Sequence, residues 1–331
     1  ELVSKNIPVL VFDIHRDYIT AFDNAYIITF DAKEKEFIEK LLEERGKNSR
    51  VFVGKFSLDI IKEYMEEILG ISEKQAAHVF RLLSGLLSCK PKTIKQLLNW
   101  LEGEDMEPCA RKFLGADSFK DTTKESLKSR IYRIREWRLF RRNVEDGGED
   151  LEELINRILN EIREGRGIFK EDYEVRDGEV VVKRVEDRIN LVILDLYPLS
   201  IEEQRILMDI ILEKVYEIYK KWKFEMKTDV LGVVIEEAHR FASKDVKSSS
   251  KISLIAREGR KFGLGLILVS QIPSKIHEDI ISQINTFLLL KIINPKDLEF
   301  IRKTCPYLSR EYFEALTRLE TGKCLMVGLA V

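Results

Sequence analysis

The stretch that decides the fold is residues 229–241, DVLGVVIEEAHRF, in which a short apolar run ends at two adjacent carboxylates. An apolar run bounded by charged residues is typical of a strand that is buried on both faces of a parallel sheet. Open α/β sheets bind their ligands at the carboxyl ends of their strands. We therefore expect Glu236 and Glu237 to emerge together at the ligand-binding edge of such a sheet.

Two adjacent carboxylates at this edge suit nucleotide hydrolysis. One carboxylate can hold a hydrated Mg²⁺, and the next can orient or deprotonate an attacking water. This is the Walker B arrangement of nucleoside triphosphatases. Its usual companion, the phosphate-binding motif G-x-x-x-x-G-K-[ST], is absent from the 331 residues. Taken alone, the pair fits the acidic start of an ordinary helix equally well, because carboxylates are favoured at helix N-termini.

Length and composition describe a globular protein with a substantial core. A chain of 331 residues suggests two domains, or one domain with a large insertion. Its net charge of −2 excludes few partners, because a nearly neutral protein can still bind nucleic acid through one surface. The apolar runs are too short to span a bilayer and no signal peptide is visible, so we expect a cytoplasmic protein without membrane contact.

The cysteines give no sign of a metal site or a cross-link. Cys89, Cys109, Cys305 and Cys324 lack any C-x-x-C spacing. We therefore expect neither a zinc site nor a disulfide framework, and a reducing cytoplasm is the simplest setting.

Strand-like runs recur along the chain. They predict strands at 9–13, 25–30, 190–196, 264–270, 286–293 and 324–330. Because these runs alternate with helical patterns, we predict an α/β fold with a mostly parallel sheet. A hairpin is expected at 174–185, with its turn at Asp177 and Gly178. Ser200 and Glu203 have the spacing of a capping box and predict the start of a long amphipathic helix.

Residues 33–166 have a mostly helical pattern. The spacings Ser72 to Gln75 and Thr93 to Gln96 are those of capping boxes and predict two helix starts. We therefore expect a first part of the core at 1–30, a helical insertion at 31–168 and the remainder of the core at 169–331.

A second polar pair follows the predicted strand at 264–270. Ser270 and Gln271 stand where that strand ends. In nucleotide-hydrolysing cores, a polar residue at this place can reach the γ-phosphate or the attacking water. Two polar-tipped strands at one sheet edge favour a nucleotide site more strongly than either strand does alone.

Basic residues are concentrated just before this strand, in AREGRKFG at 256–263. Arg257, Arg260 and Lys261 fit a solvated helix end, where cations complement the helix dipole. They also fit an arginine finger that reaches the nucleotide of a neighbouring subunit, where a guanidinium stabilises transition-state charge. We favour the finger, with Arg260 preferred over Arg257.

Other candidate residues carry less information. Asp13 closes the strand at 9–13 and is expected beside the nucleotide or its Mg²⁺. His15 and His239 lie near the predicted site, but an isolated histidine is more often structural than catalytic. His239 could respond to the nucleotide state, although a packed or solvent-facing helix residue is the commoner explanation.

Two basic stretches could meet nucleic acid. The loop FASKDVKSSSK at 241–251 places Lys244, Lys247 and Lys251 among small polar residues, which suits sequence-independent phosphate contacts. The stretch at 128–142 has an apolar stripe that favours an amphipathic helix packed on the core over a DNA-binding helix.

Taken together, these motifs resemble the HerA-type ATPases of the FtsK–HerA group, which are hexameric DNA translocases. The resemblance rests on VLVFDIHRDY, VVIEEAHRF, AREGRKFGLGLILVSQIPSKI, SQINTFLLLKIINPKD and TGKCLMVGLA, in this order along the chain. Asp13 aligns with the acid of the family pattern FD-x-H-G-E-Y, but Arg16 and Asp17 stand where Gly and Glu are usual.

The resemblance implies a RecA/FtsK-like P-loop fold that uses ATP and Mg²⁺. Glu236 would be the metal-associated acid, Glu237 the catalytic base, Gln271 the sensor and Arg260 or Arg257 the finger. It also implies a homo-hexamer that moves along double-stranded DNA and works with a NurA-like nuclease in end resection and recombinational repair. In this family a P-loop precedes the first strand, so we expect the sequence to be a fragment that starts after it and is inactive alone.

Two other functions fit the same residues. One is a related ring motor for conjugation, secretion or genome packaging. The other is an assembly module without hydrolysis, which would apply if the native protein had no phosphate loop.

Overall fold

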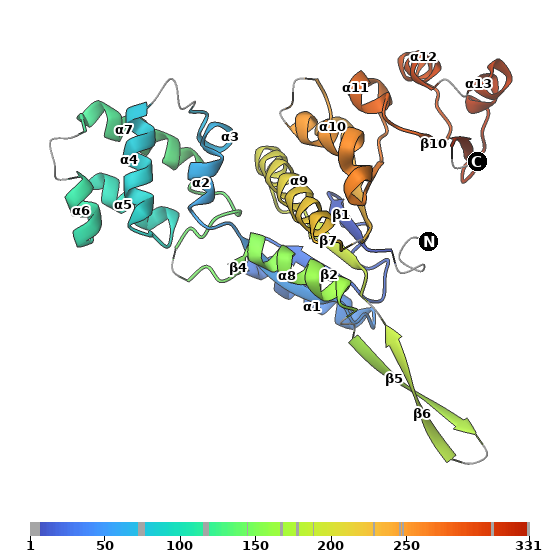
Figure 1. Cartoon of the computed structure of the whole chain (residues 1–331), viewed down its shortest axis with the longest axis horizontal. Helices are drawn as coiled ribbons and strands as arrows, with labels where there is room; N and C mark the ends of the chain where they lie inside the picture. Colours follow the sequence, from blue (N-terminus) through green and yellow to red (C-terminus); the bar gives the residue numbers. More distant parts are fainter. Residues whose placement is uncertain are drawn as a thin grey trace. The chain divides into compact units, whose positions relative to one another are not determined.

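The computed structural model, whose elements are labelled in Figure 1, divides into two compact units. It describes residues 7–71, 77–114, 119–143, 145–165, 168–176, 179–187, 189–227, 229–244, 246, 248–305 and 308–329, with the backbone alone at 168–187, 248 and 310. One unit comprises Glu1–Ile14 and Met208–Val331, and the other comprises His15–Leu207. The predicted division of the chain near residues 31 and 168 stays a prediction.

Among the residues that the structure describes, the main sheet has seven strands in the order β4-β3-β2-β7-β1-β8-β9. The pairs β1–β8, β8–β9, β2–β3, β2–β7 and β3–β4 are all parallel. Parallel strands need crossover connections, which explains why helical segments separate them along the chain. The prediction of a mostly parallel α/β sheet is confirmed.

The first unit is built on three of these strands. They are β1 (Val9–Asp13), β8 (Leu231–Ile235) and β9 (Leu264–Leu268). Every residue of β1 and β8 is buried, as expected for apolar strands covered on both faces. The same unit contains α10 (Ser248–Glu258) and most of α9 (Ile201–Phe224). Ser200 and Glu203 exchange hydrogen bonds at the start of α9, which confirms the predicted capping box.

The end of the chain departs from the prediction in one respect. The two last strands, β10 (Thr286–Leu289) and β11 (Leu325–Gly328), pair antiparallel in a small sheet of their own. Between them lie α12 (Pro295–Thr304) and α13 (Arg310–Leu316), and the short α11 (Glu278–Ile281) precedes them.

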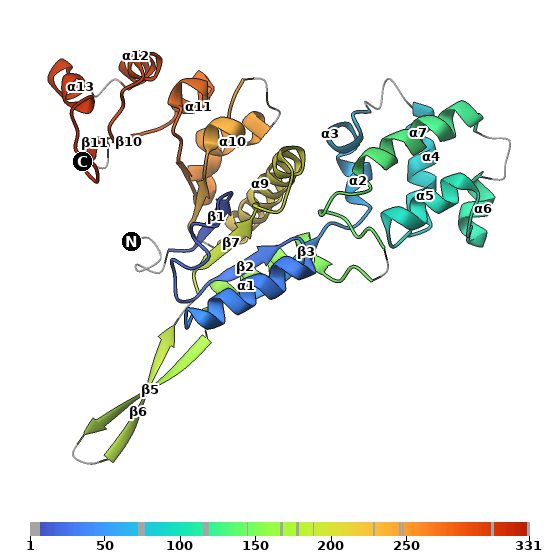
Figure 2. The ribbon, with the colours of Figure 1, turned by 180° about the vertical axis from the view of Figure 1, so that it is seen from behind.

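The second unit contains the other half of the main sheet. Its strands are β2 (Tyr26–Thr29), β3 (Arg50–Lys55), β4 (Glu149–Asp150) and β7 (Leu191–Asp195). Figures 1 and 2 show α1 (Ala32–Glu44) and α8 (Leu151–Arg163) on opposite faces of these strands. Strand β3 lies in a stretch that was expected to be helical. Its short run RVFVGK carries charges at both ends and a glycine, so its apolar pattern is weak.

In the described part of the segment between β3 and β4, six helices pack mainly on one another. They are α2 (Ile60–Glu63), α3 (Met65–Leu69), α4 (Ala77–Ser88), α5 (Ile94–Glu102), α6 (Pro108–Leu114) and α7 (Asp121–Ile134). Thr93 caps α5 as predicted, whereas Ser72 and Gln75 lie outside the described residues. Helix α7 ends earlier than predicted. Its apolar stripe is nevertheless core, because Ile131, Ile134, Trp137 and Phe140 are all buried.

A disulfide between Cys89 and Cys109 corrects the prediction of unlinked cysteines. Cys89 follows α4 and Cys109 lies in α6, and their Cα atoms are 5.7 Å apart. The chain folds back through α5, so two residues 20 positions apart meet, which sequence spacing alone does not reveal. Cys305 and Cys324 are not in a disulfide.

The predicted hairpin is confirmed and is longer than expected. Strands β5 (Ile168–Arg176) and β6 (Glu179–Asp187) pair antiparallel from Ile168 opposite Asp187 to Arg176 opposite Glu179. The predicted turn at Asp177 and Gly178 lies outside the described residues. Within the described part of the chain, no helix has the length and apolar character needed to cross a membrane.

Candidate functional site

The double-Glu segment lies at the carboxyl edge of the first unit's strands, as predicted. Phe12 of β1 is opposite Ile235 of β8, so Asp13 and Glu236 are the next residues on neighbouring strands. Asp13 is fully buried and Glu236 is 8% exposed. Carboxylates brought together in this way are suitable ligands for Mg²⁺, which one or two carboxylates normally hold together with phosphate oxygens and water.

Glu237 has an unusual backbone conformation. Its φ of 45° and ψ of 42° lie in the left-handed region, which costs a non-glycine residue about 1–2 kcal/mol. The surrounding turn holds this conformation. Ala238 N donates to Val269 O at 2.9 Å, and Arg240 N donates to Glu237 O at 2.8 Å. Strain of this kind persists only where neighbouring contacts enforce it and is often found at functional sites.

Both oxygens of the Glu237 carboxylate contact side chains of this unit. Gln271 Nε2 donates to Glu237 Oε1 at 2.6 Å. His239 Nδ1 lies 3.2 Å from Glu237 Oε2 and 3.3 Å from Ser270 Oγ. The structure therefore brings together the two polar pairs that the sequence identified, Glu236 with Glu237 and Ser270 with Gln271. Sequence reasoning gave little weight to His239, which joins them.

The environment of His239 favours a neutral ring. Burial lowers the pKa of His239 below its usual value, the Glu237 carboxylate opposes this shift, and Lys275 and Arg240 add to it. The ring is therefore neutral near pH 7 and carries a proton on only one of its nitrogens.

The predicted finger residues lie at the end of α10 and in the following turn. Arg257, Arg260 and Lys261 are exposed. Tyr216 holds this segment from α9 through a hydrogen bond to Glu258 at 3.2 Å and an edge-on contact with Phe262. The turn then closes at Gly263 with a φ of 86°, where a Cβ would lie 2.2 Å from Asp229 O, so only glycine fits. The backbone that carries the exposed guanidinium groups is thus held in place by contacts with α9 and by the turn at Gly263.

The predicted DNA-contacting lysines are placed differently from one another. Lys244 is exposed in the turn before α10. Lys251 lies within α10, and its Nζ is 2.6 Å from Glu213 Oε1, so an ion pair already engages it. Lys247 lies outside the described residues.

The segment after β1 contains a buried ion pair that the sequence analysis missed. Arg16 Nε and Nη2 donate to the two carboxylate oxygens of Asp195 at 3.0 and 2.8 Å, and Arg16 also binds Glu34. Thr29 Oγ1 donates to Asp195 at 2.9 Å. Thr29 ends β2 and Asp195 ends β7, whereas Glu34 lies in the first turn of α1. The sequence signal for this ion pair was the carboxylate of Asp195, a charged residue near the end of the apolar strand predicted at 190–196.

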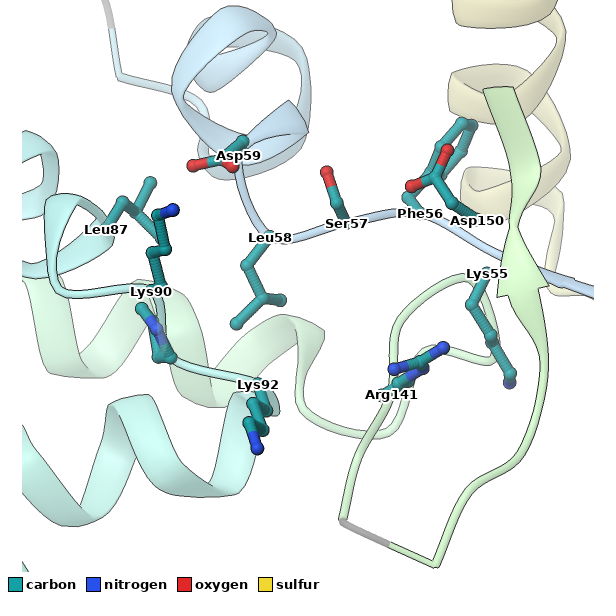
Figure 3. A pocket seen from close by; sticks show the side chains of 11 residues that line it. Lys55, Phe56, Ser57, Leu58, Asp59, Leu87, Lys90, Lys92, Arg141 and Asp150 are labelled. Atoms are coloured by element: carbon teal, nitrogen blue, oxygen red, sulfur yellow. The ribbon is translucent and has the colours of Figure 1, made fainter. Parts of the chain in front are cut away.

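A separate pocket of about 380 Å³ lies in the second unit. Figure 3 shows Lys90 and Lys92 from the turn after α4, Lys55 from the end of β3 and Arg141 around it, together with Asp150 of β4. None of the predicted site residues lines this pocket.

The fold and the site define a parallel α/β protein with acidic and amide side chains clustered at the carboxyl edge of its sheet. The chain belongs to the family described as "Helicase HerA, central domain", which it matches over residues 1–215.

Several relatives carry the name DNA double-strand break repair helicase HerA, and two of them illustrate the likeness. The protein of Sulfurisphaera tokodaii is 34% identical over 64% of this chain and 45% of its own length. That of Pyrococcus furiosus is 28% identical over 82% of this chain and 52% of its own length. The chain thus spans about half the length of the curated relatives it matches. Among solved structures, VirB4 of Thermoanaerobacter pseudethanolicus aligns with 97% of this chain and 86% of its own at 14% identity, with a TM-score of 0.48.

Proposed function

We propose that the chain is the central ATPase part of a HerA-type helicase that moves along double-stranded DNA. The observation that carries this proposal is the carboxylate of Glu237, held by Gln271 and His239 beside the acidic strand ends. Two relatives named as DNA repair helicases support the choice of substrate.

The proposed reaction is attack of water on the γ-phosphate of ATP. Glu237 accepts a proton from the attacking water or orients it, and Gln271, with Ser270, contacts the water or the phosphate. Asp13 and Glu236 are the residues that would hold Mg²⁺. When bound, the cation neutralises charge on the phosphate oxygens. The chemistry left to the protein is mainly positioning, which suits a carboxylate restrained at both oxygens.

We further propose that another strand, followed by a glycine-rich phosphate loop, covers the free edge of β9. Among the described strands, β9 pairs with β8 alone. Ile267 on β9 and Val269 just after it are exposed apolar residues. Exposed apolar side chains along a strand edge are typical of a surface that another element covers. Calorimetric titration of ATP and Mg²⁺ should then give weak binding to residues 1–331 and tight binding to the intact protein.

The remaining parts of the proposal concern assembly. A finger at Arg260 or Arg257 requires a neighbouring subunit, so we propose a homo-oligomeric ring, with six subunits as in the family it resembles. A NurA-like nuclease partner and a role in end resection follow from the same resemblance. We also propose that the protein acts in the cytoplasm.

Stimulation by DNA tests this function against the alternatives. We expect duplex DNA to raise the rate of ATP hydrolysis by the intact protein, and the protein to move along duplex DNA in an ATP-dependent manner. Hydrolysis that is indifferent to DNA would favour a motor for another cargo. Absence of both nucleotide binding and hydrolysis in the intact protein would favour an assembly module.

A further inference from the structure

His239 occupies a junction between two polar pairs. It lies in the single turn Ala238–Arg240 that follows the double-Glu strand, and its side chain is 15% exposed. The same ring atom, Nδ1, is 3.2 Å from Glu237 Oε2 and 3.3 Å from Ser270 Oγ. Glu237 follows β8 and Ser270 follows β9, so one nitrogen links the ends of two neighbouring strands.

The direction of this hydrogen bond follows from the partners. A carboxylate only accepts hydrogen bonds, and Glu237 Oε2 lies 3.2 Å from Nδ1, so this carboxylate favours the tautomer of the neutral ring that carries its proton on Nδ1. In this tautomer Nδ1–H donates to Ser270 Oγ at 3.3 Å, and its positive end also lies beside Glu237 Oε2 at 3.2 Å. Ser270 Oγ also accepts from Ile272 N at 3.1 Å, which fixes its position at the end of the strand.

The two carboxylate oxygens of Glu237 are thus restrained by different segments. Gln271 Nε2 donates to Oε1 at 2.6 Å, and His239 Nδ1 lies 3.2 Å from Oε2. With only one of these donors, the carboxylate could turn about its last side-chain bond. With both, its plane is fixed relative to the end of β9.

We propose that His239 is a positioning residue, whose Nδ1–H orients the Glu237 carboxylate and couples it to Ser270 at the end of β9. This inference rests on the proposed function, because it assigns Glu237 the role of base. If Ser270 and Gln271 move when they contact the γ-phosphate, Gln271 transmits this movement to Glu237 directly. Ser270 transmits it to Glu237 through His239.

Substitutions that keep or remove the donor at Nδ1 test this role in the intact protein. Removal of the donor in His239→Ala should lower kcat for ATP hydrolysis by about tenfold or more, with KM for ATP changed less than about twofold. His239→Asn carries an amide where Nδ1 lies and should restore most of kcat. His239→Gln reaches toward the Nε2 position instead and should restore little.

A matched control is His277, whose Nδ1 accepts from Asp279 N at the start of α11. His277→Ala removes a histidine with a local structural role in the same unit, and it should leave kcat unchanged. Coupling to Ser270 is tested by a double-mutant cycle. Ser270→Ala and His239→Ala should be less than additive in their effect on kcat, because each breaks the same link.

The possible results separate this inference from the proposed function. If the wild-type protein hydrolyses ATP and Glu237→Gln does not, but His239→Ala keeps or raises kcat, the positioning role is wrong. Equal activity of the Asn and Gln variants would also contradict it, and this comparison remains available if His239→Ala does not fold. If the wild-type protein hydrolyses no ATP, the proposed function itself fails.

Discussion

At the scale of single residues, Arg16 shows how this chain departs from its family pattern. It stands where the pattern FD-x-H-G-E-Y has glycine, and its φ is 65°. Glycine adopts this conformation freely, whereas arginine does so at a cost of about 1–2 kcal/mol. The guanidinium compensates by binding the buried Asp195 with two hydrogen bonds, and it stacks on Tyr197 at 4.5 Å.

This arrangement predicts that Arg16→Ala and Arg16→Gly both destabilise the protein. Each leaves the buried Asp195 without its cation, which costs about 3 kcal/mol. The alanine variant should be less stable than the glycine variant by about a further 1 kcal/mol, because alanine retains the left-handed strain. Urea unfolding measures both differences. Equal midpoints for the two variants would contradict the strain argument.

Lys55 gives a prediction for pH. It is 3% exposed, and its Nζ donates to Phe30 O and Arg138 O at 2.7 and 2.5 Å. Burial lowers the pKa of Lys55 to about 8, against an ordinary value of 10.5. Between these values the unfolded chain binds the proton more tightly than the folded chain does. The contribution of Lys55 to stability therefore rises as the pH increases from about 8 to about 10.5.

The comparison that isolates this effect is with Lys55→Met, whose side chain does not titrate. We expect the free energy of unfolding of the wild type, relative to that of Lys55→Met, to increase between pH 8 and pH 10. Denaturant unfolding at several pH values provides the measurement. A constant difference across this range would show that the pKa of Lys55 is not lowered.

The limits of the sequence are clearest in the candidate site. Glu236, Glu237, Ser270 and Gln271 could be predicted to share an edge, because strand ends in a parallel sheet lie side by side. The contacts of His239 could not be predicted, because they depend on the left-handed backbone conformation of Glu237, which no sequence pattern indicates.

At the scale of elements, apolar runs predicted strands well where both faces are buried. Strand β3 escaped prediction because it lies toward the edge of the sheet, beside the short β4, and its residues are only partly buried. Helix α7 ends at Ile134, before the end of the predicted helix. The apolar stripe did not reveal this, because it continues through a non-helical segment at 135–140. An apolar stripe therefore predicts which residues are buried more reliably than it predicts where a helix ends.

The disulfide between Cys89 and Cys109 makes a prediction about the helical segment. Removing a cross-link that closes a loop of this size costs about 3 kcal/mol. We expect a reductant, or Cys89→Ser, to lower the midpoint of thermal unfolding, whereas Cys324→Ser should have little effect. Thiol titration of the unreduced, unfolded protein checks the bond itself. For residues 1–331, two thiols are expected, and four would contradict the cross-link.

At the scale of the whole molecule, the account requires that subunits share active sites. If Arg260 acts in a neighbouring subunit, Arg260→Ala should lower kcat by on the order of a thousandfold, while ATP binding is kept. Mixing Arg260→Ala subunits with Glu237→Gln subunits should then restore activity. Some interfaces in the mixture combine an intact Glu237 from one chain with an intact Arg260 from the other.

Failure of the mixed assembly to regain activity would place Arg260 in its own subunit's site or outside any site. Arg257→Ala provides the internal comparison, because it differs in position by less than one helical turn. A larger loss for Arg257→Ala would transfer the proposed role to that residue.

The central claim is that Glu237 is the base for ATP hydrolysis. The most direct test is to measure ATP binding and steady-state hydrolysis for the intact protein and for Glu237→Gln, with Glu278→Gln, at the exposed start of α11, as a control for loss of a carboxylate. We predict that Glu237→Gln binds ATP as tightly as the wild type and loses hydrolysis, while Glu278→Gln keeps both. Undiminished turnover by Glu237→Gln would contradict the account.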